Sequence, residues 1–79
     1  MITREEIRSK RVLKNLNQNQ LAEKAGVSIT SVVRIESEKY GPGRSTPEII
    51  KKIFGVLEID YELTIDGTPV AAGDKAGDI

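Results

Sequence analysis

Apolar residues recur three or four positions apart through the first 57 residues, as they do on the buried face of an amphipathic helix. The longest of these stripes consists of Ile50, Ile53, Phe54 and Leu57. Three shorter stripes precede it: Ile7 with Val12 or Leu13; Leu21, Ala22 and Ala25; and Val32 with Ile35. The sequence therefore predicts a compact all-α unit of four helices over residues 1–57.

Side chains that cap helices mark where each predicted helix begins. The four capping positions are Thr3, Asn17, Ser28, and either Ser45 or Thr46. At the first two, a Glu or Gln three residues later completes the capping-box pattern. Asn15 and Gly26 tolerate the left-handed conformation, so the first two helices are predicted to end there. Gly55, inside the fourth helix, either allows close packing or marks an early end.

The stretch from Asn17 to Glu36 predicts two short helices joined by a tight turn. On the second of these helices, Val32 and Ile35 face inward. The residues left on its outward side are Ile29, Thr30, Ser31, Val33 and Arg34. A loop with two glycines and a proline follows, and Tyr40 is expected to anchor this loop against the core.

After Leu57 the apolar pattern changes from helical spacing to strict alternation. The alternating apolar positions are Ile59, Tyr61, Leu63 and Ile65. This pattern predicts a half-buried strand, and a short fifth helix over residues 60–63 is the alternative. A lone strand has unpaired edges, and Pro69 disfavours a hairpin back through residues 68–70. We therefore expect the strand to pair with the same strand of a second copy, giving a dimerisation segment over residues 58–70.

Length and composition limit the chain to one small domain with little room for chemistry. It has 79 residues, of which 38% are hydrophobic. Cys and His are both absent, so no enzyme activity, metal or cofactor is expected. The sequence has no signal-peptide pattern and no apolar run of membrane-spanning length, so an intracellular protein is expected. Residues 71–79 lack periodicity and are predicted to be a disordered tail.

The formal net charge of zero conceals two regions of opposite charge. Residues 1–54 carry eleven Lys and Arg against six Asp and Glu, a net charge of +5. Residues 55–79 carry one Lys against six Asp and Glu, a net charge of −5. This asymmetry fits a phosphate-facing surface with an acidic segment kept away from it or turned to another partner. Charge distributed for solubility alone is the alternative.

The run L-A-x-K-x-G-V-S, with Gln18 three positions before its leucine, resembles the helix-turn-helix of lambdoid phage repressors and Cro proteins, the XRE-type regulators. The resemblance covers roughly residues 4–57. It implies a helix-turn-helix domain that binds double-stranded DNA and regulates transcription in the cytoplasm of a bacterial or phage-infected cell. It also implies that the helix after Ser28 is the recognition helix, held by a buried ion pair between Arg11 and Glu36; a solvated arginine is the alternative.

Ten residues are candidates for DNA contact under this resemblance: Asn17, Gln18, Ser28, Ile29, Thr30, Ser31, Val33, Arg34, Lys39 and Arg44. Arg34 can bond guanine bidentately. Ile29 departs from the polar residue that is common at its position, so it either touches a thymine methyl group or is partly buried. Gln18 is expected to reach the DNA backbone and to brace the start of the recognition helix. Lys39 and Arg44 either meet phosphates or are solvated loop charges.

The alternating segment is similar to that of small antitoxins and autoregulators that dimerise through a strand after the fourth helix. The contacts expected at the dimer interface are Ile59, Tyr61, Leu63 and Ile65. Such a homodimer, a repressor or autoregulator, would bind a near-palindromic operator. The alternative is an antitoxin whose acidic C-terminal segment neutralises a partner toxin while its basic region represses its own operon.

Overall fold

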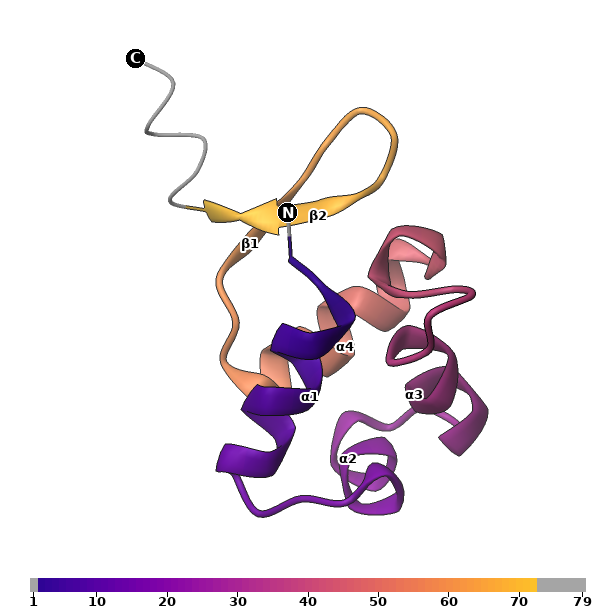
Figure 1. Ribbon diagram of the computed structural model, residues 1–79, viewed down its shortest axis with the longest axis vertical. Helices are drawn as coiled ribbons and strands as arrows, with labels where there is room; N and C mark the ends of the chain where they lie inside the picture. The colour runs from indigo at the N-terminus through magenta and orange to yellow at the C-terminus, as the bar shows by residue number, and fades with distance from the viewer. Residues whose placement is uncertain (1, 73–79) are drawn as a thin grey trace.

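Four helices and a terminal β-hairpin make up the fold (Figure 1). The computed structural model describes residues 2–72. The helices are α1 (Arg4–Leu13), α2 (Gln18–Ala25), α3 (Ile29–Ile35) and α4 (Pro47–Leu57), with a short 3-10 turn, η1 (Pro42–Arg44), before α4. The strands are β1 (Tyr61–Leu63) and β2 (Pro69–Ala71). The predicted four-helix domain with a following strand is confirmed, and the alternative of a fifth helix is wrong.

Local hydrogen bonds set where each helix begins, as the capping pattern predicts. The Asn17 side chain accepts from the Gln20 N–H at 2.7 Å, and the Gln20 side chain accepts from the Asn17 N–H at 2.9 Å. The other helices each begin with one side-chain acceptor: Thr3 for α1, Ser28 for α3 and Thr46 for α4. Ser45 is therefore not the cap of α4, and its hydroxyl donates to the Gly41 carbonyl at 3.2 Å.

Residues in the left-handed conformation follow α1, α2 and α4. Asn15 has φ 58° and Gly26 has φ 70°, which confirms the predicted ends of α1 and α2. Glu58 follows α4 with φ 57°, a conformation that is unfavourable for a residue with a Cβ atom. Lys14 forms an ion pair with the Glu58 carboxylate and so ties the end of α1 to the end of α4.

The core lies between the four helices. The buried side chains that the helices contribute are Ile7, Leu21, Ala22, Val32, Ile35, Ile50, Ile53, Phe54 and Leu57. Helical periodicity predicts these positions, and α4 supplies the largest share of them. The expectation that Val12 or Leu13 joins Ile7 in the core is wrong, because these side chains are 56% and 77% exposed. Leu16 and Val27 pack against the edge of this core. Ile2, which precedes the first helix and belongs to no stripe, is buried as well.

Gly55 neither ends α4 nor permits a close contact. The helix continues to Leu57, and a Cβ atom built at Gly55 would meet no atom within 4 Å. Both explanations for this glycine are therefore wrong. Nothing in the described part of the chain requires glycine at this position.

The C-terminal strand pairs with a second strand of its own chain, so the expectation that Pro69 disfavours a hairpin is wrong. β1 and β2 run antiparallel, with Leu63 opposite Pro69. The hydrogen-bonded positions are the neighbouring ones, because the Thr64 N–H donates to the Thr68 carbonyl at 3.0 Å. Pro69 thus stands where an N–H would point away from β1, so the ladder loses no hydrogen bond. On that outer side, the Pro69 carbonyl accepts from the Ile2 N–H at 3.4 Å.

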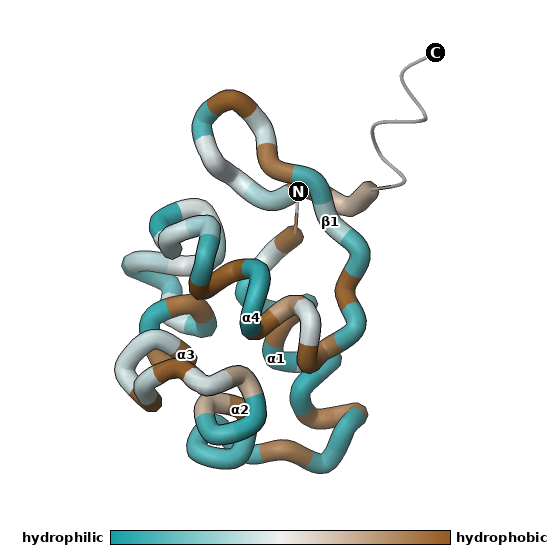
Figure 2. The backbone as a smooth tube through the Cα atoms, turned by 180° about the vertical axis from the view of Figure 1, so that it is seen from behind, coloured by the Kyte–Doolittle hydropathy of each residue, from teal (hydrophilic) through white to brown (hydrophobic). Residues whose placement is uncertain are grey.

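One end of the hairpin packs on the helices and the other projects from them (Figure 1, Figure 2). At the packed end, the Tyr61 ring meets the Phe54 ring edge-on, with 5.0 Å between the centroids. At the projecting end, Leu63 is 41% exposed and Ile65 is fully exposed. The apolar face of the predicted strand is therefore covered only in its first half.

The predicted tail over residues 71–79 lies mostly outside the described part of the chain. Ala71 belongs to β2, and residues 73–79 are not among the described residues. Among the helices that the structure describes, none has the length and apolar character needed to cross a membrane.

Candidate nucleic-acid interface

A three-residue turn joins α2 to α3 and fixes the angle between them. The left-handed Gly26 ends α2, and the Val27 N–H donates to the Ala22 carbonyl at 3.0 Å. Val27 then packs against the core, and Ser28 caps α3. The two helices form a helix-turn-helix with α3 at the surface of the molecule (Figure 1).

One side of α3 is buried and the other is free. Val32 and Ile35 are completely buried against the core. The exposed residues of α3 are Ile29, Thr30, Val33 and Arg34. At 3.6 residues per turn, Thr30, Val33 and Arg34 lie on the side opposite the buried pair. This side of α3 therefore presents aliphatic groups, one hydroxyl and one guanidinium to the surroundings of the protein.

Two hydroxyl groups at the start of α3 bond to each other. The Ser28 Oγ accepts from the Ser31 N–H at 3.2 Å and lies 3.1 Å from the Ser31 Oγ. Both side chains therefore help to close the first turn of the helix. A hydroxyl has one donor and two acceptor sites, so each keeps capacity for a further hydrogen bond.

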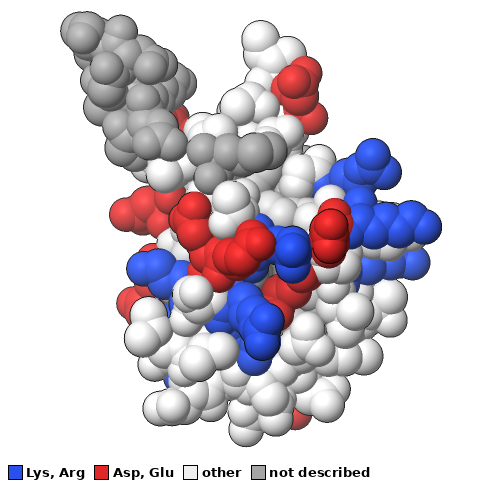
Figure 3. Space-filling view, viewed as in Figure 1, with Lys and Arg blue, Asp and Glu red and all other residues white. Residues whose placement is uncertain are grey.

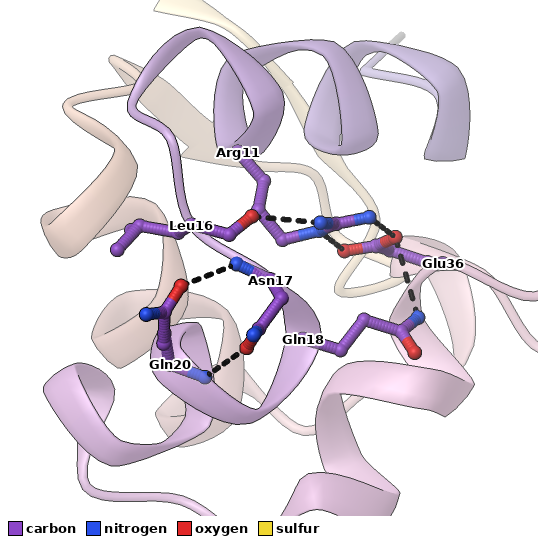
Figure 4. A network of polar contacts seen from close by, with 6 residues as sticks. All are labelled: Arg11, Leu16, Asn17, Gln18, Gln20 and Glu36. Carbon is purple, nitrogen blue, oxygen red and sulfur yellow. Dashed lines mark hydrogen bonds and ion pairs between the residues drawn. The ribbon is translucent and has the colours of Figure 1, made fainter.

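The side chains of Asn17 and Gln18, at the start of α2, make contacts within the protein. Asn17 forms the capping box. Gln18 is half-buried, and its Nε2 donates to the Glu36 Oε1 at 3.4 Å (Figure 4). Because Glu36 follows the last residue of α3, Gln18 braces the end of that helix, and the expectation that it braces the start is wrong.

Arg11 and Glu36 form the expected ion pair. The Arg11 Nε donates to the Glu36 Oε2 at 2.7 Å, and the Arg11 Nη2 donates to the Glu36 Oε1 at 3.0 Å (Figure 4). The remaining Nη1 donates to the Leu16 carbonyl at 2.8 Å. Only 12% of the arginine side chain and 5% of the glutamate side chain are exposed. The pair holds the end of α3 against α1 and thereby orients the exposed side of α3.

Tyr40 lies at the surface of the loop after α3, which corrects the expectation that it anchors this loop in the core. Its side chain is 40% exposed. The ring centroid lies 5.4 Å from the Arg34 Cζ and 5.7 Å from the Lys39 Nζ. The residues of the loop that are buried are the next two, Gly41 and Pro42.

A hollow of about 210 Å³ lies between α3 and the start of α4. Its polar lining consists of Ser31, Arg34, Tyr40, Arg44, Ser45 and Thr46. Arg34 comes from α3 and Arg44 from η1, so two elements bring guanidinium groups to one concave place. Guanidinium and hydroxyl donors in this arrangement suit a phosphate or the edge of a base.

On the face that Figure 3 shows, positive charge is concentrated at one edge, and charges of both signs are mixed over the middle. In Figure 3, Lys and Arg side chains gather at the right-hand edge, over the segment between α3 and α4. Acidic side chains lie on the hairpin and below it (Figure 3). The exposed cations between the start of α3 and the start of α4 are Arg34, Lys39 and Arg44. A local excess of positive charge beside α3 attracts a polyanion to that side of the molecule.

The sequence pattern does not reveal the role of Tyr40, Ser45 and Thr46 in this surface. Ser45 and Thr46 are recognisable only as helix caps. An aromatic residue between Lys39 and Gly41 has no apolar neighbours in sequence, and that isolation is the one signal against a place in the core. Its contact with Arg34 depends on how the loop folds back, which no local pattern predicts.

Comparison with known proteins also indicates a helix-turn-helix domain. The sequence profile of the helix-turn-helix family matches residues 7–63. The chain is 46% identical over 46 residues to an uncharacterized HTH-type transcriptional regulator of Methanocaldococcus jannaschii, an alignment that covers 58% of this chain and 70% of the relative. It is 41% identical over 58 residues to the HTH-type transcriptional repressor RghR of Bacillus subtilis, which covers 73% of this chain and 42% of that protein. No solved structure gives a significant match.

The matched region includes the main elements of the surface described above. Residues 7–63 contain the turn between α2 and α3, the exposed side of α3 and the segment that leads to α4. They also contain the Arg11–Glu36 pair that orients α3. The chain therefore belongs to the XRE-type helix-turn-helix family of DNA-binding transcriptional regulators.

Proposed function

We propose that the chain acts as a homodimer that binds a near-palindromic operator and represses transcription there. One observation carries this proposal: the outward side of α3 is free, and exposed cations flank it. These residues are Ile29, Thr30, Val33 and Arg34 on the helix, with Lys39 and Arg44 beside it. An α-helix with short side chains fits the major groove of B-DNA. Occupancy of the site accounts for repression, and no catalytic step is involved.

Arg34 is the residue that we assign to base reading. Arg34 is an exposed residue, and arginine bonds guanine O6 and N7 together, which discriminates between bases by about 1–3 kcal/mol. Thr30 lies one turn earlier on the same side and can bond a base edge through its hydroxyl. Ile29 and Val33 offer only aliphatic contact, which suits the methyl group of thymine. One strong hydrogen-bonding group gives a single half-site modest specificity, and two half-sites compensate for this.

Groups on two sides of α3 are proposed to bind the DNA backbone. Lys39 and Arg44 lie exposed in the segment after α3. At the start of α2, Asn17 and Gln18 are engaged within the protein, so we assign the contact there to backbone N–H groups at the positive end of the helix. Contacts of this kind set the register of the protein on the duplex and carry little sequence information.

The hairpin is the proposed dimer contact. Leu63 faces Pro69 at a non-hydrogen-bonded position, so its own N–H and carbonyl groups point to the outer edge of β1. Within residues 2–72 no strand pairs with that edge, and the exposed Leu63 and Ile65 lie beside it. An antiparallel β1 of a second copy would pair the edge and cover both side chains. Ile59 and Tyr61 pack against their own core, so their part in the interface is indirect.

A two-fold dimer brings its two recognition helices to one face of the duplex, about 34 Å or one helical turn apart. This spacing is the reason for a near-palindromic operator. One of the two relatives is by name a transcriptional repressor, which supports repression, although this chain spans only 42% of its length. We place the activity in the cytoplasm, where bacterial and phage DNA is transcribed.

A second candidate function is that of an antitoxin that also represses its own operon. It is favoured by the projecting hairpin, whose acidic residues Asp60, Glu62 and Asp66 stand beside the exposed Leu63 and Ile65. Such a surface fits a partner protein with a basic and apolar edge. Purification of the untagged product of a neighbouring gene together with this chain would support the antitoxin. A chain that forms only homodimers would contradict it.

Selection of preferred sites from random double-stranded DNA, followed by footprinting, tests the main proposal. We expect enrichment of two inverted half-sites with centres about 10 base pairs apart, and protection of both by two chains. Binding that enriches no sequence would contradict specific regulation. Protection of a single half-site by one chain would contradict the dimer.

A further inference from the structure

Arg34 and Tyr40 lie against each other on the surface that faces DNA in the proposed function. The Arg34 Cζ is 5.4 Å from the centroid of the Tyr40 ring, within the range of a cation–π contact. The ring is 40% exposed. Because Tyr40 lies at the surface and not in the core, its ring can attract the cations beside it.

Hydrogen bonds from the backbone and from the Ser37 side chain hold the loop in the position that places the ring beside Arg34. The Arg34 carbonyl accepts from the Ser37 N–H at 3.0 Å, from the Ser37 Oγ at 2.7 Å and from the Gly41 N–H at 3.1 Å. The Ser37 Oγ in turn accepts from the Tyr40 N–H at 3.1 Å. Tyr40 and its neighbour are thus fastened to the backbone of the arginine that the ring touches.

Gly41 makes this return of the chain possible. It adopts φ 65° with ψ −178°, a combination that is essentially restricted to glycine. A Cβ atom there would lie 3.6 Å from the Ser37 carbonyl oxygen, an ordinary contact. Glycine is therefore required by the backbone conformation and not by lack of space. This conformation defines the shape of the loop next to the Tyr40 ring.

The Tyr40 ring and Arg44 act on the Arg34 guanidinium in opposite senses. Arg34 lines the hollow between α3 and α4 together with Tyr40 and Arg44. The like charge of Arg44 repels the Arg34 guanidinium. The ring attracts the same guanidinium through its negative face. An arginine that is already restricted loses less rotamer freedom when it bonds a base.

We propose that Tyr40 is a positioning residue for Arg34, which holds the guanidinium at the hollow beside α3 in readiness for a base. The inference rests on the proposed function, because it assumes that Arg34 reads DNA. Lys39, whose Nζ is 5.7 Å from the same ring, is assigned to phosphate binding. The Tyr40 ring thus connects the base-reading cation to a phosphate-binding one.

The position of Arg34 in the free protein is tested without DNA. The Arg34 side-chain protons that lie over an aromatic ring are shifted upfield in the NMR spectrum. We expect this shift in the wild type and in Tyr40→Phe, which keeps the ring, and its loss in Tyr40→Leu. Arg34 protons at unperturbed positions in the wild type would overturn the inference.

The effect on base reading is tested with the selected operator in a double-mutant cycle. Tyr40→Leu should lower the discrimination at the base pair read by Arg34 by about 2- to 5-fold, and Tyr40→Phe should retain it. In an Arg34→Ala background, Tyr40→Leu should not change the discrimination further. Tyr40→Leu that weakens binding to all DNA alike, or that has the same effect without Arg34, would overturn the inference.

Arg34→Ala separates failure of the inference from failure of the proposed function. If Arg34→Ala leaves every base preference intact, the assignment of Arg34 to base reading is wrong and the inference falls with it. If Arg34→Ala removes one preference and Tyr40→Leu does not reduce it, only the inference is overturned. Thermal melting of each variant controls for folding, and Tyr40→Met provides a second variant without a ring.

Discussion

The Arg11 guanidinium donates two hydrogen bonds, of 2.7 and 3.0 Å, to the carboxylate of Glu36, which lies 25 positions away in sequence. Arg11 belongs to α1, and Glu36 caps the C-terminal end of α3. The contact therefore fixes the helix with the exposed, DNA-facing side chains against the rest of the domain. Gln18 adds a third contact to the same carboxylate from α2.

Removal of either partner should destabilise the domain. Glu36→Gln leaves the Arg11 guanidinium in a largely buried site without its counter-charge, at a cost of about 3–5 kcal/mol. Arg11→Met leaves the Glu36 carboxylate without its counter-charge and should have a similar effect. The double variant Arg11→Met with Glu36→Leu should recover much of the loss, because no charge is left buried. Denaturant unfolding measures all four proteins, and single variants as stable as the wild type would show that water replaces the missing partner.

Gly55→Ala should stabilise the domain by about 0.5–1 kcal/mol and raise Tm by a few degrees. The residue lies in α4, and the added Cβ meets no atom within 4 Å. Gly26→Ala is the matched control, since its Cβ also meets no atom within that distance. Gly26 has φ 70°, so alanine there should be destabilising by about 1 kcal/mol. Thermal unfolding of both variants measures the contrast, and a shift of the same sign in both would contradict it.

The pair of Lys14 and Glu58 should make stability depend on pH in the acid range. The hydrogen bond from Lys14, and then its charge, lowers the pKa of Glu58 below its ordinary value of 4.5. A pKa that is lower in the folded state gives a contribution that is complete above the unfolded pKa and is lost as pH falls through the folded pKa. Wild type should therefore exceed Glu58→Gln in stability near neutral pH, and the difference should vanish in strong acid.

Unfolding curves of wild type and Glu58→Gln between pH 7 and pH 2 measure this difference. Glutamate and glutamine both place a Cβ atom at the left-handed position 58, so the comparison isolates the effect of the charge. Lys14→Gln removes the other partner, so the stability difference between wild type and Lys14→Gln should show the same pH dependence. A difference that stays constant down to pH 2 would mean that the ion pair contributes nothing.

Lys39→Ala and Arg44→Ala should weaken binding to all DNA sequences alike. Each exposed cation that meets a phosphate releases a counterion, so each substitution should reduce the slope of log K against log salt by about one unit. The binding constant for the operator and for an unrelated duplex, measured over a range of salt concentrations, gives this slope. An unchanged slope would mark the residue as a solvated charge.

The helix boundaries were predictable because a few adjacent residues decide them. The Asn17 capping box, the left-handed Asn15 and the left-handed Gly26 all lie where the sequence places them. Helical periodicity likewise predicts the buried positions of α4. The Arg11–Glu36 pair is different, since it rests on the resemblance to a family and not on any spacing that the chain itself shows.

Two of the errors concern features that depend on strand register or on the path of a loop. Pro69 disfavours a hairpin only if its missing N–H would have pointed at β1, and the observed register turns that position outward. Tyr40 lies outside the core because the loop folds back onto the Arg34 carbonyl, to which Ser37 and Gly41 donate hydrogen bonds. Neither register nor loop path can be read from hydrophobic pattern alone.

The central claim is that the outward side of α3 enters the major groove and that Arg34 reads a base there. The most direct test compares wild type and Arg34→Ala in binding the selected operator and every single-base variant of it. We expect wild type to lose about 5- to 150-fold in affinity when one guanine is replaced, and Arg34→Ala to bind all bases at that position alike. An identical pattern of base preferences in the two proteins would contradict the claim.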